Sequence, residues 1–114
     1  MKVKYSQIVR RKIKALKKRL AAEFGREASD KAINHITSVV RNLEIFPEQG
    51  PSLSSLYDIE CDYRYLSISH NYLFYRIEGD TVIIIEMFDE RENFMYQLFG
   101  ISSISQESED FWGE

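Results

Sequence analysis

Apolar positions in the first half of the chain recur every three or four residues, which is the period of a helix that buries one face. The first apolar stripe is formed by Val9, Ile13, Leu16, Leu20 and Phe24. The second is formed by Ala28, Ala32, Ile36, Val39, Leu43 and Phe46, and it is widened by Ile33 and Val40. We therefore predict two amphipathic helices, one after the other.

Both predicted helices carry residues that are typical of helix ends. The Ser6 hydroxyl can cap the first helix, and Gly25 after it is typical of a left-handed C-cap. Pro47 is expected to end the second helix, because proline lacks an amide hydrogen and disfavours helical geometry in the residue before it. With so short a link at Gly25, the two helices are predicted to be antiparallel neighbours.

Short apolar runs in the second half predict strands. Residues 51–62 are expected to form a loop. Strands are then expected at residues 63–69, 72–77 and 81–88, in addition to a short one at residues 1–5. Turns are predicted at His70-Asn71 and at residues 78–80, where a glycine suits a hairpin loop. The unbroken run Val82–Ile85 indicates that the last of these strands is central in the sheet.

The end of the chain predicts a helix and a tail. Residues 91–99 can form a short helix that ends at Gly100, and residues 101–114 are acidic and expected to be mobile. The predicted fold class is thus α+β, as a single domain over residues 1–100. It comprises an N-terminal strand, an antiparallel helical hairpin packed on an antiparallel β-meander, and a short C-terminal helix.

Composition limits the class of protein. The single cysteine, Cys61, excludes an internal disulfide and is consistent with a reducing compartment. No apolar run approaches the roughly 18 residues of a membrane span, and the polar N-terminus lacks the apolar core of a secretory signal. We therefore expect a cytoplasmic protein that does not enter a membrane.

Charge is divided unevenly along the chain. Residues 1–31 have a net charge of +8 and residues 32–114 a net charge of −11. Five of the cations of the first predicted helix lie mainly opposite its apolar stripe, and they are Arg10, Arg11, Lys14, Lys17 and Lys18. Such a face can bind an acidic partner protein or nucleic acid. A solvated helix surface with no partner is the alternative, and the charge pattern alone leaves both open.

Few residue patterns point to catalysis. The two histidines have no metal-ligand spacing, and no glycine-rich phosphate loop or nucleophile elbow is present, so we expect no metal and no cofactor. Polar and aromatic candidates come from the predicted meander and the helix after it, and they are Arg64, Tyr65, His70, Tyr72, Tyr75, Arg76 and Arg91. Arginine can hold phosphate, tyrosine can stack on a base and histidine can act as a general base. Alternatively, the tyrosines are half-buried strand formers and Arg91 pairs with neighbouring carboxylates.

Three segments in order resemble the RelE/ParE toxin superfamily. They are FGREASDKAINHI (24–36), LEIFPEQG (43–50) and YRYLSISHNYLFYRIEGDTVIIIEMFDERENFMYQLF (63–99), within a resemblance that covers about residues 3–99. The resemblance implies a growth-inhibiting toxin of a bacterial type II toxin–antitoxin system, neutralised by a cognate antitoxin and without a small-molecule cofactor. It also makes residues 46–50, here named the FPEQG loop, the joint between the helical hairpin and the sheet.

The superfamily implies two possible targets. RelE-like members cut messenger RNA on the ribosome, whereas ParE-like members act on DNA gyrase and need no nuclease residues. On the RelE interpretation the catalytic residues would be Arg64, Arg91 and Tyr96. Because the first two meander strands carry few cations to stabilise charge on a phosphate, the sequence favours the ParE branch. RelE-like cleavage, an attenuated toxin and a non-catalytic nucleic-acid-binding module stay open.

Overall fold

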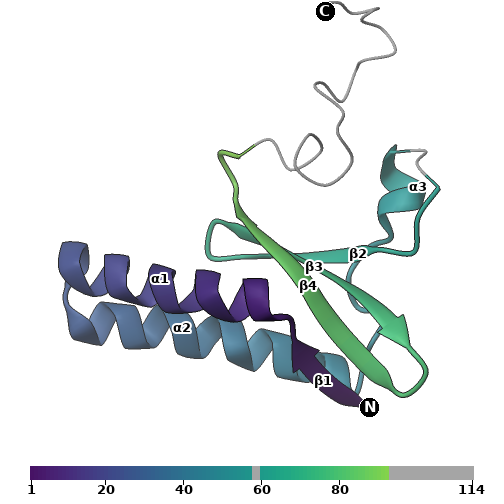
Figure 1. Cartoon of the computed structure of the whole chain (residues 1–114), viewed down its shortest axis with the longest axis horizontal. Coiled ribbons are helices and arrows are strands. Elements are labelled where there is room, and N and C mark those ends of the chain that lie inside the picture. The colour runs from purple at the N-terminus through teal and green to yellow at the C-terminus, as the bar shows by residue number, and fades with distance from the viewer. Residues whose placement is uncertain (58–59, 93–114) are drawn as a thin grey trace, which may run out of the picture.

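The computed structural model describes residues 1–57 and 60–92, in which a helical hairpin covers one face of a four-stranded sheet (Figure 1). The elements in chain order are β1 Lys2–Tyr5, α1 Gln7–Phe24, α2 Arg26–Arg41, the 3₁₀ turn η1 Asn42–Glu44, α3 Leu53–Tyr57, β2 Arg64–Ile68, β3 Asn71–Glu78 and β4 Thr81–Asp89. The predicted α+β class is confirmed. The predicted C-terminal helix from residue 93 onward, Tyr96 and the acidic tail lie outside the described residues.

The sheet has the strand order β1-β4-β3-β2. Strands β2, β3 and β4 form the predicted antiparallel meander. Strand β1 instead runs parallel to β4, with Lys2 opposite Thr81 and Tyr5 opposite Ile84. The sheet is therefore mixed rather than antiparallel throughout, because the helical hairpin and the meander carry the chain back to the same end of the sheet before β4 begins. The central position predicted for β4 is confirmed.

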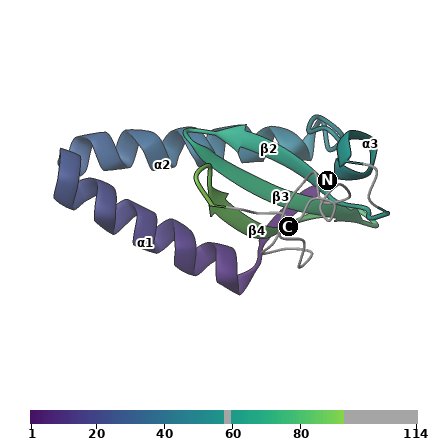
Figure 2. The same ribbon diagram turned by 90° about the horizontal axis from the view of Figure 1, so that it is seen from above.

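The helical hairpin lies against the sheet in two views at right angles (Figures 1 and 2), and the side chains of the core lie between them. Buried apolar side chains of the helical layer meet those of the meander; they are Val9, Leu16, Ile36, Val40 and Leu43 on one side and Leu66, Ile68, Leu73, Tyr75, Val82, Ile84 and Met87 on the other. The predicted stripes are wrong at their ends. Phe24 and Phe46 are 67% and 64% exposed, because the hairpin extends past the sheet at one end and η1 replaces α2 at the other.

Both helix-end predictions can be compared with the backbone. Ser6 caps α1 as predicted, since its Oγ accepts a hydrogen bond of 3.1 Å from the Val9 amide. Gly25 has a φ of 97° but a ψ of 160°, so it is not the predicted left-handed helical cap. It is the sole residue between α1 and α2, and this positive-φ extended geometry, accessible mainly to glycine, reverses the chain within one residue.

Two local predictions in the second half are also corrected. The β2–β3 turn is formed by Ser69 and His70, with φ of 49° and 67°, as in a type I′ hairpin. The prediction was displaced by one residue, because Asn71 already pairs with Ile68 and is buried. The predicted loop over residues 51–62 contains α3, whose Leu53 is buried with Phe74 and Phe88 on the opposite face of the sheet.

Candidate functional site

The FPEQG loop is fixed to the sheet by Tyr75 of β3. The Tyr75 side chain is completely buried, and its hydroxyl donates a hydrogen bond of 2.8 Å to the Pro47 carbonyl. The same hydroxyl accepts a hydrogen bond of 2.9 Å from the Gly50 amide. Burial raises the pKa of the Tyr75 phenol above its ordinary value, so the hydroxyl stays protonated and able to donate.

Gly50 and Arg64 complete this attachment. A Cβ atom at Gly50 would lie 2.2 Å from the Tyr65 carbonyl oxygen, so only glycine fits this close approach of two backbone segments. The Arg64 guanidinium donates hydrogen bonds of 2.8 Å to the Gly50 carbonyl and 3.4 Å to the Glu48 carbonyl. Arg64, a predicted catalytic residue, is therefore engaged in holding the loop.

Arg91 lies in a different environment, beside the β2–β3 turn. Its Nε and Nη2 atoms donate hydrogen bonds of 2.9 and 3.2 Å to the two carboxylate oxygens of Asp89. These hydrogen bonds lower the pKa of Asp89 to about 2, so the carboxylate remains charged at neutral pH. The Arg91 side chain is 82% exposed. It forms the surface ion pair that was the alternative to a catalytic role.

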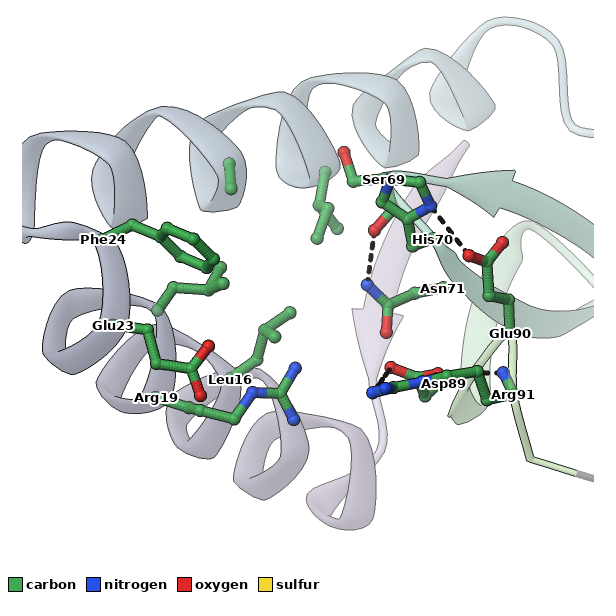
Figure 3. Close-up of a pocket in the computed structure, with 13 residues that line it drawn as sticks. Leu16, Arg19, Glu23, Phe24, Ser69, His70, Asn71, Asp89, Glu90 and Arg91 are labelled. Carbon is green, nitrogen blue, oxygen red and sulfur yellow. Dashed lines mark hydrogen bonds and ion pairs between the residues drawn. The ribbon is translucent and has the colours of Figure 1, made fainter.

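A groove of about 570 Å³ opens next to this ion pair, between the helical hairpin and the turn (Figure 3). Its apolar lining includes Leu16 and Phe24, and His70 at its rim lies 2.9 Å from Glu90 through Nδ1. Arg19 and Glu23 of α1 border the groove on the side opposite His70 and Glu90. Cations and carboxylates thus alternate around the rim, so the groove has no surplus of positive charge for a phosphate.

Arg64 and Arg91, two of the three predicted catalytic residues, are not brought together by the fold. Arg64 pairs with Tyr75 at one end of the β2–β3 hairpin, whereas the turn and Arg91 lie at the other. Four steps along β2 separate these ends by roughly 13 Å. Tyr96 lies outside the described residues, so the catalytic assignment stays a prediction.

Three other candidates on the meander, Tyr65, Tyr72 and Arg76, also contact side chains of the same chain. Tyr65 and Tyr72 lie on the sheet face opposite the helical hairpin, half-buried and edge to face, with ring centroids 5.9 Å apart. Arg76 pairs with Glu78 at 2.6 Å. These positions match the interpretation of the tyrosines as half-buried strand formers.

A second groove, of about 850 Å³, runs between α1 and α2 and is here named the basic groove. The cations that line it are Arg11, Lys14, Lys17, Lys18 and Arg26. Four of the five predicted partner-binding cations are among them, whereas Arg10 is exposed on α1 outside the lining. Arg26 was not predicted, because it belongs to α2 and reaches the groove only through the pairing of the helices.

Small residues allow the two helices to pack closely beneath these cations. The buried Ser29 hydroxyl donates a hydrogen bond of 2.7 Å to the Lys17 carbonyl across the helix pair. Ala15 and Ala21 contribute apolar surface to the groove. Asp30 is the one carboxylate among the lining residues, and its oxygen lies 4.0 Å from the Lys17 ammonium. The groove therefore combines an apolar floor with a strongly cationic border.

The family described as the ParE toxin of the type II toxin–antitoxin system, parDE, matches residues 3–94. The chain belongs to the ParE toxin family. This membership confirms the RelE/ParE prediction and makes the chain a toxin of a type II toxin–antitoxin system, with a cognate antitoxin as its partner.

Solved structures agree on the fold. A chain described as "Chromosomal ParDE TA system from P. aeruginosa" superimposes with a TM-score of 0.65 at 20% sequence identity. The match covers 78% of this chain and 95% of that chain. At this identity the likeness concerns the fold alone. A search of curated proteins finds no match.

Residues 1–57 and 60–92 contain no group of three or more histidine, cysteine, aspartate or glutamate side chains placed to hold a metal ion. The same residues contain no helix long and apolar enough to cross a membrane. Two grooves with charged borders lie within the described residues, the one beside Arg91 and the basic groove.

Proposed function

We propose that this ParE-family toxin inhibits growth in the cytoplasm by binding DNA gyrase, and that it does not cleave messenger RNA. The proposal rests on one observation. Both candidate arginines already bind other groups of the chain, and they do so at separate places. Arg64 donates to the carbonyls of Glu48 and Gly50, and Arg91 is bound by Asp89. Cleavage requires cations placed together at the phosphate on which negative charge develops. A toxin that acts by binding alone has no such requirement.

Two assays on the purified toxin test this proposal. Supercoiling of relaxed plasmid by gyrase should be inhibited in proportion to toxin concentration. In parallel, messenger RNA on programmed ribosomes should stay uncut after addition of the same preparation. Codon-positioned cuts without inhibition of gyrase would contradict the proposal and favour RelE-like cleavage.

The basic groove is the surface that we assign to the antitoxin. Its five cations, listed above, face a single lining carboxylate, Asp30, so an acidic segment is the complementary partner. The alanines of the floor leave room for apolar side chains of that segment. An amphipathic helix with acidic borders would therefore place its apolar face on Ala15 and Ala21, and its carboxylates beside the lysines.

Charge reversal tests the antitoxin surface. The double variant Lys14→Glu/Lys18→Glu should dissociate from the antitoxin faster than the wild-type toxin, and the salt dependence of binding should decrease. Lys31→Glu is the matched control, because Lys31 is exposed on α2 and does not line the groove. Unchanged kinetics in the double variant would place the antitoxin elsewhere.

The basic groove also favours one alternative function, which the same variants examine. If the isolated toxin is a nucleic-acid-binding module, it should bind DNA or RNA with an affinity that falls steeply with salt. Lys14→Glu/Lys18→Glu would then abolish that binding. Absence of salt-sensitive binding by the wild-type toxin supports the protein partner.

A further inference from the structure

The edge of β4 beside β1 is only half covered by a strand. Strand β1 pairs with β4 from Thr81 to Ile84, and the chain then turns into α1 at Ser6 (Figure 1). Within the described residues no strand pairs with this side of β4 from Ile85 to Asp89. An uncovered edge presents backbone groups to which another strand can add.

Side chains occupy the backbone groups of this edge one after another. The Ile85 carbonyl accepts a hydrogen bond of 3.1 Å from the Ser6 hydroxyl. The Met87 amide donates a hydrogen bond of 2.9 Å to Glu86 Oε1, and the Met87 carbonyl accepts one of 2.8 Å from Lys12 Nζ. Each of these bonds takes the place of a bond to a neighbouring strand.

Hydrogen bonds that replace those to a partner strand continue to the end of β4. The Asp89 amide donates a hydrogen bond of 3.0 Å to Glu92 Oε2, and the Asp89 carbonyl accepts one of 2.9 Å from the Glu92 amide. Both backbone groups of Met87 and both of Asp89 are therefore bound without a partner strand. Side chains at a strand edge, lysine above all, are a common protection against unwanted pairing.

Lys12 and Glu86 are the central elements of this protection. Lys12 Nζ lies 2.7 Å from Glu86 Oε1, and the two side chains are 37% and 19% exposed. The ammonium also lies 4.3 Å from the centroid of the Phe88 ring. A groove of about 300 Å³, lined by Lys12, Met87 and Asp89 among others, separates α1 from the edge. Lys12 lines this groove and reaches across it to the Met87 carbonyl.

We propose that the Lys12–Glu86 pair prevents this toxin from pairing, edge to edge through β4, with a second copy of the chain. The amide and the carbonyl of Met87 both point sideways from the free edge of β4, away from β3. Their partners, Glu86 Oε1 and Lys12 Nζ, lie at this edge. In an antiparallel pair, two opposed residues exchange both of their backbone hydrogen bonds. Two copies related by a twofold axis at Met87 satisfy this pattern with identical residues, so the edge is complementary to itself.

Removal of the pair tests the proposal directly. Lys12→Met/Glu86→Ala should convert a monomeric toxin into one that dimerises with increasing concentration, as measured by sedimentation equilibrium. Lys31→Met is the control for the lysine substitution, because it makes the same change at an exposed position on α2. A folded double variant that stays monomeric over the same concentration range would overturn the proposal.

Amide hydrogen exchange provides a second test that does not depend on folding of the double variant. In the wild-type toxin, the Met87 amide should exchange far more slowly than the same residue in an unstructured peptide. Glu86→Ala should accelerate that exchange in dilute solution, and high protein concentration should slow it again by pairing. Fast exchange of this amide in the wild type would show that the edge is not protected, and would overturn the proposal.

Discussion

Arg64 and Arg91 lie near opposite ends of the β2–β3 hairpin, and they differ in their exposure and in the groups that they bind. At one end, Arg64 donates to carbonyls of the FPEQG loop beside the buried Tyr75 hydroxyl. At the other, Arg91 pairs in solvent with Asp89 near the turn. The bonds from Arg64 and Tyr75 fix two backbone segments together, whereas the exposed pair connects residues two positions apart. Arginine on a predicted active-site strand is therefore no evidence of catalysis until its partners are known.

Gly50→Ala should have the largest effect, at the loop end of the hairpin. The added Cβ would lie 2.2 Å from the Tyr65 carbonyl oxygen, which is backbone and cannot move aside alone. Overpacking of this kind should lower the free energy of unfolding by about 3 kcal/mol, as measured by urea denaturation. Gln49→Ala, at an exposed residue of the same loop, is the control and should change it by less than about 0.5 kcal/mol. Equal effects of the two variants would show that the loop is not held against β2.

Tyr75→Phe should have the next largest effect. The substitution keeps the ring and removes the hydroxyl, leaving the Gly50 amide and the Pro47 carbonyl without their partner. Unpaired polar groups in this position should lower the free energy of unfolding by about 2 kcal/mol. A loss too small to measure would mean that water replaces the hydroxyl, and that the loop is attached mainly by Arg64.

Arg64→Ala should cost less, about 1 to 2 kcal/mol of unfolding free energy, because Arg64 is only half-buried and water can reach the freed carbonyls. Arg64→Lys should recover part of this loss, since an ammonium can donate to the Gly50 carbonyl but not in the same geometry. Any loss of toxicity in either variant should follow the loss of folded protein. Loss of toxicity in fully folded Arg64→Lys would instead indicate a direct role for the guanidinium.

Arg91→Gln should have the smallest effect on stability, at the turn end. Its clearest result should be on the pKa of Asp89, which should rise from about 2 toward the ordinary value near 4 when the guanidinium is removed. A lowered carboxylate pKa stabilises the folded state above the unfolded pKa, and that contribution is lost as pH falls from about 4 to about 2. Titration by nuclear magnetic resonance checks the value, and an unchanged Asp89 pKa would mean that the ion pair does not form in solution.

Much of the architecture could be predicted from local patterns. The period of the apolar residues predicted α1, α2 and the meander, and Ser6 was recognised as a cap because capping acts over three residues. The parallel pairing of β1 could not be predicted, because it joins residues about 80 positions apart that carry no common signal. The turn predicted at His70-Asn71 was displaced by one residue, because Asn71, a residue type that favours positive φ, pairs with Ile68 inside the sheet instead.

The candidate site was less predictable than the fold. Tyr75 lies within an apolar strand and looks like any strand-forming tyrosine, yet its hydroxyl bonds residues 25 and 28 positions away. Arg64 and Arg91 were found as candidates from residue type and from the family resemblance, and only tertiary contacts distinguish a loop attachment from a surface ion pair. The cationic face of α1 was visible in the sequence, whereas Arg26 joins it through the pairing of two helices.

The central claim, that this toxin acts without the predicted nuclease arginines, is tested most directly by growth arrest with Arg91→Ala. Arg91 is exposed and outside the core, so the variant should fold and accumulate like the wild type. Induced at equal soluble levels in the absence of antitoxin, both chains should arrest growth to the same extent. Normal growth with folded Arg91→Ala, while wild-type toxin arrests it, would contradict the account and restore Arg91 as a catalytic residue.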